Sequence, residues 1–537
     1  MKNVLLIVLL FVSSLGMSQE VRTGSGKPFI PSKYGNDIII KMDSLDQGNT
    51  KLAIAFNGWL YSAFTTINNT DNSGGITIRK SKDNGATWTT LDSYAVSNVH
   101  YTAFDIVVSG TDTSALQLTL VGVRKDLLSN DYIMFVDNYN AIGGNFIGSP
   151  YSISTGTRVI YDVAMATDYR FPAVGASPYS ISIAYSVGSS TYDSVNSITS
   201  LDGGNSYTVF NNIATTSAYF RKVSLAYGRS TSGSNGRYFA AWEKLGTSFA
   251  RNGNIYTSRN SSTVDSYWIT PINLDSVSSS MIGLCRNPTI ASQYNDTDND
   301  SASVTTIVLV ERDYNADGSD YDLLGFYNMR SHYTNYWFRL DIVNSGEMDL
   351  QPDITYDPTY NNFLAVYFDS TNKKLPYCVN GNNLTTPSTW TYITQQYNDD
   401  SNLTAPWPKV EINPFVTQTA HVWTKNAGLN GVAMFDAEYI ATSIEEQQDA
   451  GMFSDDQLYP NPATDIATLQ FSMAGNADIT IRVFNATGTL MESRTAANRK
   501  AGAWMETFDV QNWNNGIYII SVQSNTESFT KRLVVTH

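Results

Sequence analysis

The sequence has few of the residues from which metal and redox sites are built. Its 537 residues include only two cysteines, Cys285 and Cys378, and four histidines. No Cys-x-x-Cys pair or Cys/His cluster occurs, so a zinc site is not expected. The two cysteines could form one disulfide in an oxidising compartment, and two buried thiols fit the sequence equally well.

Charge is also scarce. Charged residues make up 15% of the chain, and the net charge is −15. Because an acidic chain repels phosphate and anionic membrane surfaces, neither nucleic acid nor a membrane surface is expected as a partner. Hydrophobic residues make up 42% of the chain, which is enough apolar material for a large folded core.

Long apolar runs are missing as well. The run from Val4 to Val12 (VLLIVLLFV) is far shorter than the ~20 residues of a membrane-spanning helix. Lys2 precedes it, and the small residues Gly16 and Ser18 follow it. This order predicts a signal peptide over residues 1–18. No later segment is long and apolar enough to span a bilayer, so we expect export without a transmembrane segment.

Helical periodicity is nearly absent, and short apolar runs separated by Gly, Asn, Asp and Ser predict an all-β chain. One aromatic and aliphatic strand recurs seven times, with successive starts 57 to 68 residues apart. Each unit has room for four strands, so we predict a seven-bladed β-propeller over residues 30–440. The seven strands begin at Gly58, Leu116, Tyr179, Arg237, Thr305, Asn362 and Thr419.

Two further patterns refine the predicted propeller. A shorter strand precedes each repeated one, and three of these shorter strands share a proline, at Pro288, Pro352 and Pro408. An extra strand from Asn36 (NDIIIKMD) precedes the first full unit. Because blades bury each other's faces by stacking around an axis, we predict that this extra strand completes the last blade and closes the ring.

Two loops share a Ser-x-Asp-x-Gly pattern. Ser81–Trp88 (SKDNGATW) fits S-x-D-x-G-x-x-W, and Ser200–Tyr207 (SLDGGNSY) fits it with Tyr in place of Trp. In such a turn the Asp carboxylate accepts backbone N–H bonds, and Gly permits positive φ. The pattern resembles the Asp box of sialidases and related propellers. In that family the box lies away from the active site, so the resemblance supports the fold and says little about activity.

The C-terminal part of the chain has a different pattern. Residues 441–457 (ATSIEEQQDAGMFSDDQ) are acidic and polar without a strand pattern, which predicts a linker. Residues 458–537 contain short alternating runs, which predict a small Ig-like β-sandwich. Its predicted strands begin at Ile466, Ala477, Trp504, Gly516 and Phe529.

This C-terminal domain closely resembles the type A sorting domain of cargo of the type IX secretion system of Bacteroidetes. The resemblance implies passage through the periplasm, then recognition by the type IX translocon and its outer-membrane shuttle barrel. It also implies that a sortase removes the tail near the linker, leaving the body at the cell surface or released outside the cell. An Ig-like tail could instead be a carbohydrate-binding module, but the YPNP start and the basic final strand favour sorting. The matching residues are Tyr459, Pro460, Asn461, Pro462, Gly516, Tyr518, Lys531 and Arg532.

The propeller body has no comparable catalytic signature. A sialidase resemblance would imply three arginines that clamp a carboxylate, a Tyr nucleophile with a Glu partner, and an Asp acid/base. The nearest string to the first arginine motif is Tyr169–Pro172 (YRFP), which lies after the first Asp-box loop rather than before it. Arg221, Arg286 and Arg312 have no defined nucleophile beside them in the sequence. No catalytic residue is therefore assigned, and enzyme activity stays open.

One loop predicts a calcium site. Asp313, Asn315, Asp317 and Gly318 match the first half of an EF-hand-like loop, D-x-[DN]-x-[DN]-G, and Asp320 follows. Alternate oxygen ligands of this kind can curl around a hard cation. Loop position twelve is Leu rather than Glu, and the loop would join two strands, as a similar calcium loop does in integrin-type propellers. A solvated acidic turn is the alternative. A second acidic run covers residues 296–300.

Two functions fit these patterns. The first is a secreted or surface β-propeller that binds glycan or protein ligands, as in adhesion, nutrient capture or surface gliding. The second is a carbohydrate-active enzyme, a sialidase-like hydrolase or a lyase. An arginine or carboxylate cluster at the mouth of the central channel would favour the enzyme, and an aromatic or featureless face would favour binding.

Overall fold

The computed structural model describes residues 36–437 and 453–537 apart from short gaps. The predicted signal peptide and residues 441–452 of the predicted linker lie outside the described residues. The chain divides into two compact units, Met1–Tyr439 and Ile440–His537. Within the described ranges, no helix has both the length and the apolar character needed to cross a membrane. The gaps are 42–44, 56, 71–72, 111–115, 149, 169–178, 189–190, 230–235, 246–252, 278–283, 295–303, 315–317, 333, 344, 359–360, 381–389, 400–402, 414–417, 427–429, 474, 486–488 and 525–527.

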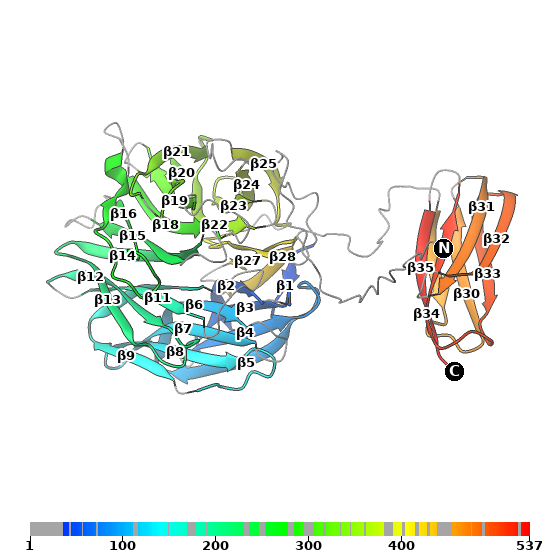
Figure 1. Cartoon of the computed structure of the whole chain (residues 1–537), viewed down its shortest axis with the longest axis horizontal. Coiled ribbons are helices and arrows are strands. Elements are labelled where there is room, and N and C mark those ends of the chain that lie inside the picture. The colour runs from blue at the N-terminus through cyan, green and yellow to red at the C-terminus, as the bar shows by residue number, and fades with distance from the viewer. Residues whose placement is uncertain are drawn as a thin grey trace, which may run out of the picture. The chain divides into compact units, whose positions relative to one another are not determined.

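The first unit contains seven four-stranded antiparallel sheets arranged as a ring, which confirms the predicted seven-bladed propeller (Figure 1). The inner strands of successive blades contact one another, and β26 contacts β2 to complete the ring. The first three blades are β2 (Asp46–Ile54), β3 (Leu60–Asn68), β4 (Ser73–Ser81) and β5 (Thr89–Ser97); β6 (Val99–Ser109), β7 (Gln117–Asp126), β8 (Tyr132–Asn140) and β9 (Tyr151–Gly156); and β10 (Val159–Thr167), β11 (Ile181–Gly188), β12 (Asp193–Ser200) and β13 (Val209–Thr216).

The other four blades follow in chain order. The fourth blade is followed by a short 3-10 helix, η1 (Leu274–Val277). The strands of blades four to seven are β14 (Tyr219–Gly228), β15 (Arg237–Leu245), β16 (Gly253–Arg259) and β17 (Ile272–Asn273); β18 (Leu284–Ser292), β19 (Thr306–Asp313), β20 (Tyr321–Asn328) and β21 (Phe338–Val343); β22 (Asp349–Asp357), β23 (Asn362–Asp369), β24 (Pro376–Asn380) and β25 (Trp390–Gln396); and β26 (Lys409–Asn413), β27 (Gln418–Lys425), β28 (Val432–Ala437) and β1 (Ile38–Ile39).

The seven repeated strands are the second strands of the blades, from β3 to β27. β11 and β23 are buried at every position. A strand in this place is covered on both faces by the neighbouring blades, so apolar residues lie on both of its faces rather than on one alone. The hydrophobic clusters accordingly combine residues from consecutive blades, such as β6–β9 with β10–β13.

The recurring prolines mark irregularities in the inner strands. The pairing of β18 with β19 shifts between Arg286 and Thr289, and the pairing of β22 with β23 shifts between Leu350 and Asp353. Pro288 and Pro352 lie within these shifts, where the missing proline N–H breaks no ladder hydrogen bond. The residue before each proline has a positive φ: 50° at Asn287, 54° at Gln351 and 46° at Trp407, before Pro408.

The N-terminal strand closes the ring, as predicted from its place before the first full unit. β1 pairs antiparallel with β28, with Ile38 opposite Phe435 and Ile39 opposite Met434. Ile40 N also donates to Ala433 O at 2.9 Å. The last blade therefore takes three strands from the end of the propeller sequence and one from its beginning.

The two Ser-x-Asp loops each join the third and fourth strands of a blade. In the first loop, Ser81 Oγ accepts from Gly85 N at 2.8 Å, and Asp83 Oδ1 accepts from Thr87 N at 2.9 Å. Burial raises the pKa of Asp83, but hydrogen bonds from Thr87 and Ser81 outweigh it and hold the pKa below its ordinary value. The second loop repeats both bonds, from Gly204 to Ser200 and from Ser206 to Asp202, at 2.7 and 2.8 Å.

The two cysteines do not form a disulfide. Cys285 in β18 and Cys378 in β24 are both buried free thiols. Burial raises the pKa of both thiols, so they remain protonated at neutral pH.

The second unit is a small β-sandwich, as predicted. One sheet has the order β29-β30-β33 and the other has the order β32-β31-β34-β35. Their facing side chains form one hydrophobic core. The strands are β29 (Phe453–Tyr459), β30 (Ile466–Met473), β31 (Ala477–Asn485), β32 (Leu490–Arg499), β33 (Gly502–Asp509), β34 (Gly516–Gln523) and β35 (Ser528–Val535).

Two parts of the sandwich correct the sequence prediction. Residues 453–457, assigned to the linker, belong to β29, which pairs with β30 through a register shift between Ser454 and Gln457. The shift breaks the alternation on which a strand prediction depends. β32 was not predicted either, because its exposed edge position allows polar residues at most of its sites.

We expect loss of β1 to destabilise the propeller. Removing residues 1–41 deletes the fourth strand of the last blade and exposes the edge of β28, whereas removing residues 1–35 leaves β1 in place. Thermal unfolding should show a lower Tm for the longer truncation than for the shorter one. Equal Tm values would show that β1 does not contribute to closure.

Candidate functional site

A cavity of about 310 Å³ lies where the seven inner strands meet. Residues from β2, β6, β10, β14, β18, β22 and β26 all line it. Its volume is at the lower end of the range for small-molecule pockets, roughly 300–1,000 Å³. Because every blade contributes to the wall, the cavity depends on a complete ring.

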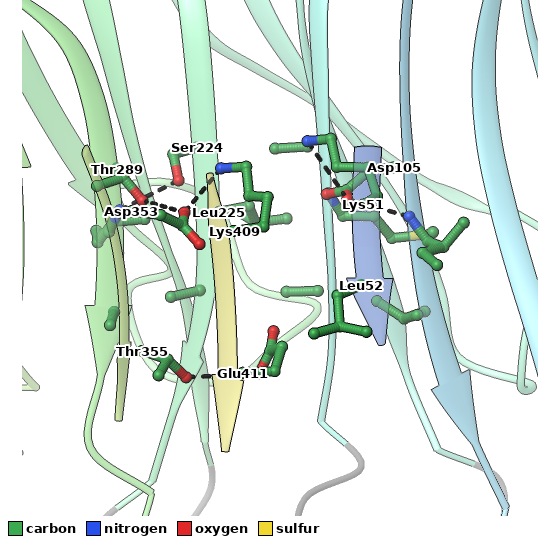
Figure 2. A pocket seen from close by; sticks show the side chains of 18 of the residues that line it. Lys51, Leu52, Asp105, Ser224, Leu225, Thr289, Asp353, Thr355, Lys409 and Glu411 are labelled. Carbon is green, nitrogen blue, oxygen red and sulfur yellow. Dashed lines mark hydrogen bonds and ion pairs between the residues drawn. The ribbon is translucent and has the colours of Figure 1, made fainter. Parts of the chain in front are cut away.

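Opposite charges face each other across neighbouring strands in this cavity. Lys409 Nζ lies 2.7 Å from Asp353 Oδ1, and Lys51 Nζ lies 3.7 Å from Asp105 Oδ1. Figure 2 shows each lysine reaching toward its aspartate from the adjacent inner strand. Thr289 Oγ1 also donates to Asp353 Oδ1 at 3.2 Å. The wall therefore presents paired charges rather than a field of one sign.

Three aspartates of the wall also hold the blades together. Each carboxylate accepts a hydrogen bond from a backbone N–H of the next inner strand, so it ties two blades across their junction. These bonds run from Met165 to Asp105 at 2.9 Å, from Val223 to Asp162 at 3.1 Å and from Val410 to Asp353 at 3.0 Å.

Two further properties of the lysines characterise the wall: a contact of Lys222 and the pKa of Lys409. Lys222 Nζ lies 4.8 Å from the ring centre of Trp407, and both residues line the cavity. Burial lowers the pKa of Lys409, but the carboxylates of Asp353, Asp105 and Asp162 outweigh it and raise the pKa above its ordinary value. Lys409 is therefore charged at any physiological pH.

The cavity changes character along the inner strands. Glu411, two residues after Lys409, accepts from Thr355 Oγ1 at 3.4 Å. Farther along, Tyr294 and Tyr356 line the wall, and their ring centres are 5.2 Å apart. The wall therefore has lysines, aspartates and Trp407 near the starts of the inner strands and tyrosines near their ends.

Three of the arginines considered for a carboxylate clamp, Arg221, Arg286 and Arg312, do not line the cavity. In the part of the chain that the structure describes, no arginine lines the cavity. Arg170 and its YRFP string lie outside the described residues. The other three arginines each lie beside their own carboxylate: Arg221 and Asp193 at 3.1 Å, Arg286 and Glu311 at 2.5 Å, and Arg312 and Asp341 at 3.6 Å.

The predicted calcium loop joins β19 and β20. Asp313 ends β19 and is fully buried; its Oδ2 accepts from Gly318 N at 2.7 Å, and its Oδ1 has no hydrogen-bond partner among the residues that the structure describes. Asp320 lies just before β20, and its carbonyl accepts from Tyr314 N. Asn315, Asp317 and the run 296–300 lie outside the described residues. Among the residues that the structure does describe, no three His, Cys, Asp or Glu side chains are grouped to hold a metal ion.

The predicted sorting residues come from the two ends of the C-terminal domain, and the structure brings several of them together. Asn461 Nδ2 donates to Arg532 O at 2.7 Å, and Asn461 Oδ1 accepts from Val534 N at 2.8 Å. Ala463 continues this contact as a parallel bridge to Val535. The YPNP segment therefore occupies the outer edge of the final strand, β35.

The other sorting residues have different surroundings. Tyr518 is buried in the core, and its hydroxyl donates to Asn514 O at 2.9 Å. Tyr459 is exposed, and its hydroxyl donates to Gln470 at 3.2 Å. Pro460 and Pro462 are exposed, Gly516 begins β34, Lys531 is half-buried, and Arg532 is exposed.

The charged residues of the cavity were not predicted from the sequence. Asp353 and Lys409 directly follow the recurring prolines Pro352 and Pro408, so their position in the repeat was visible. The sequence did not show that Asp353 and Lys409 face each other, because only the closed ring places one inner strand against the next.

The family comparison concerns the C-terminal domain. Residues 457–536 match the family described as the secretion system C-terminal sorting domain. This match confirms the sorting domain predicted from the YPNP start and the final strand, and it identifies the chain as cargo of the type IX secretion system. No curated protein sequence matches the chain.

Comparison with solved structures returns other propellers. The GH93 α-L-arabinofuranosidase of Fusarium graminearum aligns with a TM-score of 0.43 and 12% identity, covering 75% of this chain and 97% of that chain. The Trypanosoma rangeli sialidase aligns with a TM-score of 0.38 and 8% identity, covering 93% of this chain and 87% of that chain. Likenesses this weak leave the function to be argued from the cavity itself.

We expect Asn461 to be the residue that fastens the YPNP segment to β35. Asn461→Ala removes one donor and one acceptor, so the C-terminal domain should lose about 1–2 kcal/mol of stability. Hydrogen exchange should show reduced protection of the Val534 amide. The exposed Asn512, replaced by Ala, is the matched control and should leave protection unchanged. Full protection of Val534 in Asn461→Ala would contradict this role.

Proposed function

We propose that the chain is a secreted binding protein whose propeller holds part of a glycan in the cavity between its inner strands. The sorting domain supports delivery to the outside of the cell, and the cavity supports a small polar ligand. The observation that carries the proposal is the pairing of Lys409 with Asp353 and of Lys51 with Asp105 on one wall.

Paired charges suit a neutral, hydroxyl-rich ligand. A sugar hydroxyl can donate to a carboxylate and accept from an ammonium group, so one Lys–Asp pair can bind two adjacent hydroxyls. An aromatic ring adds an apolar surface for the face of a sugar, and Trp407 lines the cavity beside Lys222. A ligand with a large net charge would meet no excess of the opposite charge in this wall.

The hydrogen bonds that the cavity aspartates accept favour binding over hydrolysis. A glycoside hydrolase needs two carboxyl groups that face the scissile bond, roughly 5–10 Å apart. Asp105, Asp162 and Asp353 are each engaged by a backbone N–H of the next blade. The runner-up function, a carbohydrate-active enzyme, would have to use Glu411 together with one of them.

We propose that export begins with the signal peptide at residues 1–18 and ends with removal of the tail. We place the sortase cut between Ala441 and Gln457. Because β29 begins at Phe453, a cut before that residue would leave the sandwich intact, which favours the first part of this segment.

Glycan-array binding and hydrolysis assays on residues 19–440 test the binding proposal. We expect binding without hydrolysis, and we expect Lys51→Met to weaken it about tenfold by removing one charge-assisted hydrogen bond. Lys82→Met is the matched control, because Lys82 lies over Trp59 outside the cavity. Turnover of a glycan, or equal binding by the two variants, would contradict the proposal.

We also propose that the loop after Asp313 binds calcium. The buried Oδ1 of Asp313 supports this, because it has no hydrogen-bond partner within the described part of the chain, as does the D-x-N-x-D-G order of the loop. Calcium should raise the Tm of the protein, and Asp313→Asn or Asp317→Ala should abolish the increase. An unchanged Tm in millimolar calcium would contradict the site.

Mass spectrometry of the surface form tests the cut. We expect its C-terminus to lie between Ala441 and Gln457. A surface form that still ends at His537 would show that the tail is retained.

A further inference from the structure

The four-stranded sheet of the C-terminal domain has an outer face that the sandwich core does not cover. The sheet β32-β31-β34-β35 packs one face against the core and turns the alternate residues of its strands outward. The strand register arranges these outward residues in rows across the sheet. The rows are Leu490, Phe484, Ile519 and Arg532; Ile517 and Val534; Ser493, Arg482, Ser521 and Thr530; and Thr495, Thr480 and Gln523.

One corner of this outer face is apolar. We call it the apolar corner and define it by five residues from all four strands: Phe484, Leu490, Ile517, Ile519 and Val534. Leu490 is 50% exposed, Ile517 is 44% exposed and Ile519 is 36% exposed. Phe484 and Val534 are half-buried. A contiguous apolar patch on an exported domain is costly in water, and such patches mark surfaces that bind partners.

The charges beside the apolar corner have one sign; Asp478, the acidic residue that β31 turns to the same side, lies at the other end of that strand. Arg482 and Arg532 are the charged residues of the four rows, and both are exposed. They stand out because residues 458–537 contain six Lys or Arg and six Asp or Glu, so the net charge of −15 lies entirely in the rest of the chain. A partner for this face should therefore present carboxylates beside an apolar surface.

The edge of the sheet beside this face is already occupied. Asn461 and Ala463 bond to the outer backbone of β35, from Arg532 to Val535. A partner cannot add a strand along this stretch without displacing the YPNP segment. The face, rather than the β35 edge, is therefore what the folded domain presents near its C-terminus.

We propose that the apolar corner, flanked by Arg482 and Arg532, is the surface by which the sorting domain docks on a protein of the secretion machinery. The expected partner surface is flat and apolar with carboxylates at its rim. The proposal rests on the sorting function and adds the face that carries it. A second copy of the chain is a poor occupant, because its own face would bring arginines toward arginines.

Export of variants of the full chain by the native host tests the proposal. Ile519→Glu and Ile517→Glu each place a carboxylate in the apolar corner, and Arg532→Glu reverses a flanking charge. Each should reduce the protein at the cell surface about tenfold or more, as a disruption at the centre of an interface does. Met505→Glu is the matched control: Met505 is 60% exposed on β33 of the other sheet, and this variant should be exported normally.

Three further measurements separate lost docking from lost folding, from failure of the sorting function and from self-association. Thermal unfolding of each purified variant should match the wild type, which separates lost docking from lost folding. Deletion of residues 458–537 should abolish export; if it does not, the sorting function itself fails. If the deletion abolishes export while Ile519→Glu, Ile517→Glu and Arg532→Glu are exported normally, the docking face is wrong. A wild-type dimer that Ile519→Glu converts to a monomer would assign the corner to a second copy and also overturn the proposal.

Discussion

Burial of the second strand of each blade is the constraint on which the rest of the propeller depends. Two of these strands, β11 and β23, are buried along their whole length, and a single sheet cannot cover both of its faces. Only a closed ring gives every blade two neighbours. Closure then brings the inner strands together, and their polar residues become the wall of one cavity. The aspartates of that wall bond to the next blade, so the candidate site also stabilises the ring.

The fold could be predicted from the sequence because its signals repeat. The spacing of the apolar strands gave the number of blades, and the lone strand at Asn36 gave the closure. The turns of the two Ser-x-Asp loops could be predicted because their hydrogen bonds are local: in the first loop, Gly85 N donates to Ser81 Oγ and Thr87 N donates to Asp83 Oδ1. The strands that were missed, β29 and β32, lie at sheet edges, where polar residues and a register shift remove the pattern.

The site could be predicted only in part, for a reason that lies in the geometry. The sorting residues lie near the start and the end of the C-terminal domain, and the sequence shows these positions directly. It does not show that Asn461 bonds to β35. The cavity residues come from seven separate strands, and the partner of Lys409 is 56 residues away. The recurring prolines mark the two positions, but the local sequence does not show that they pair, so the cavity emerges only when the ring is assembled.

The two units divide the work of the protein: the tail delivers, and the propeller acts outside the cell. The most direct test is to fuse residues 441–537 to an unrelated protein that a signal peptide brings to the periplasm of the native host. The account predicts that the fusion appears outside the outer membrane and that its tail is removed. A fusion that folds but stays in the periplasm would contradict it.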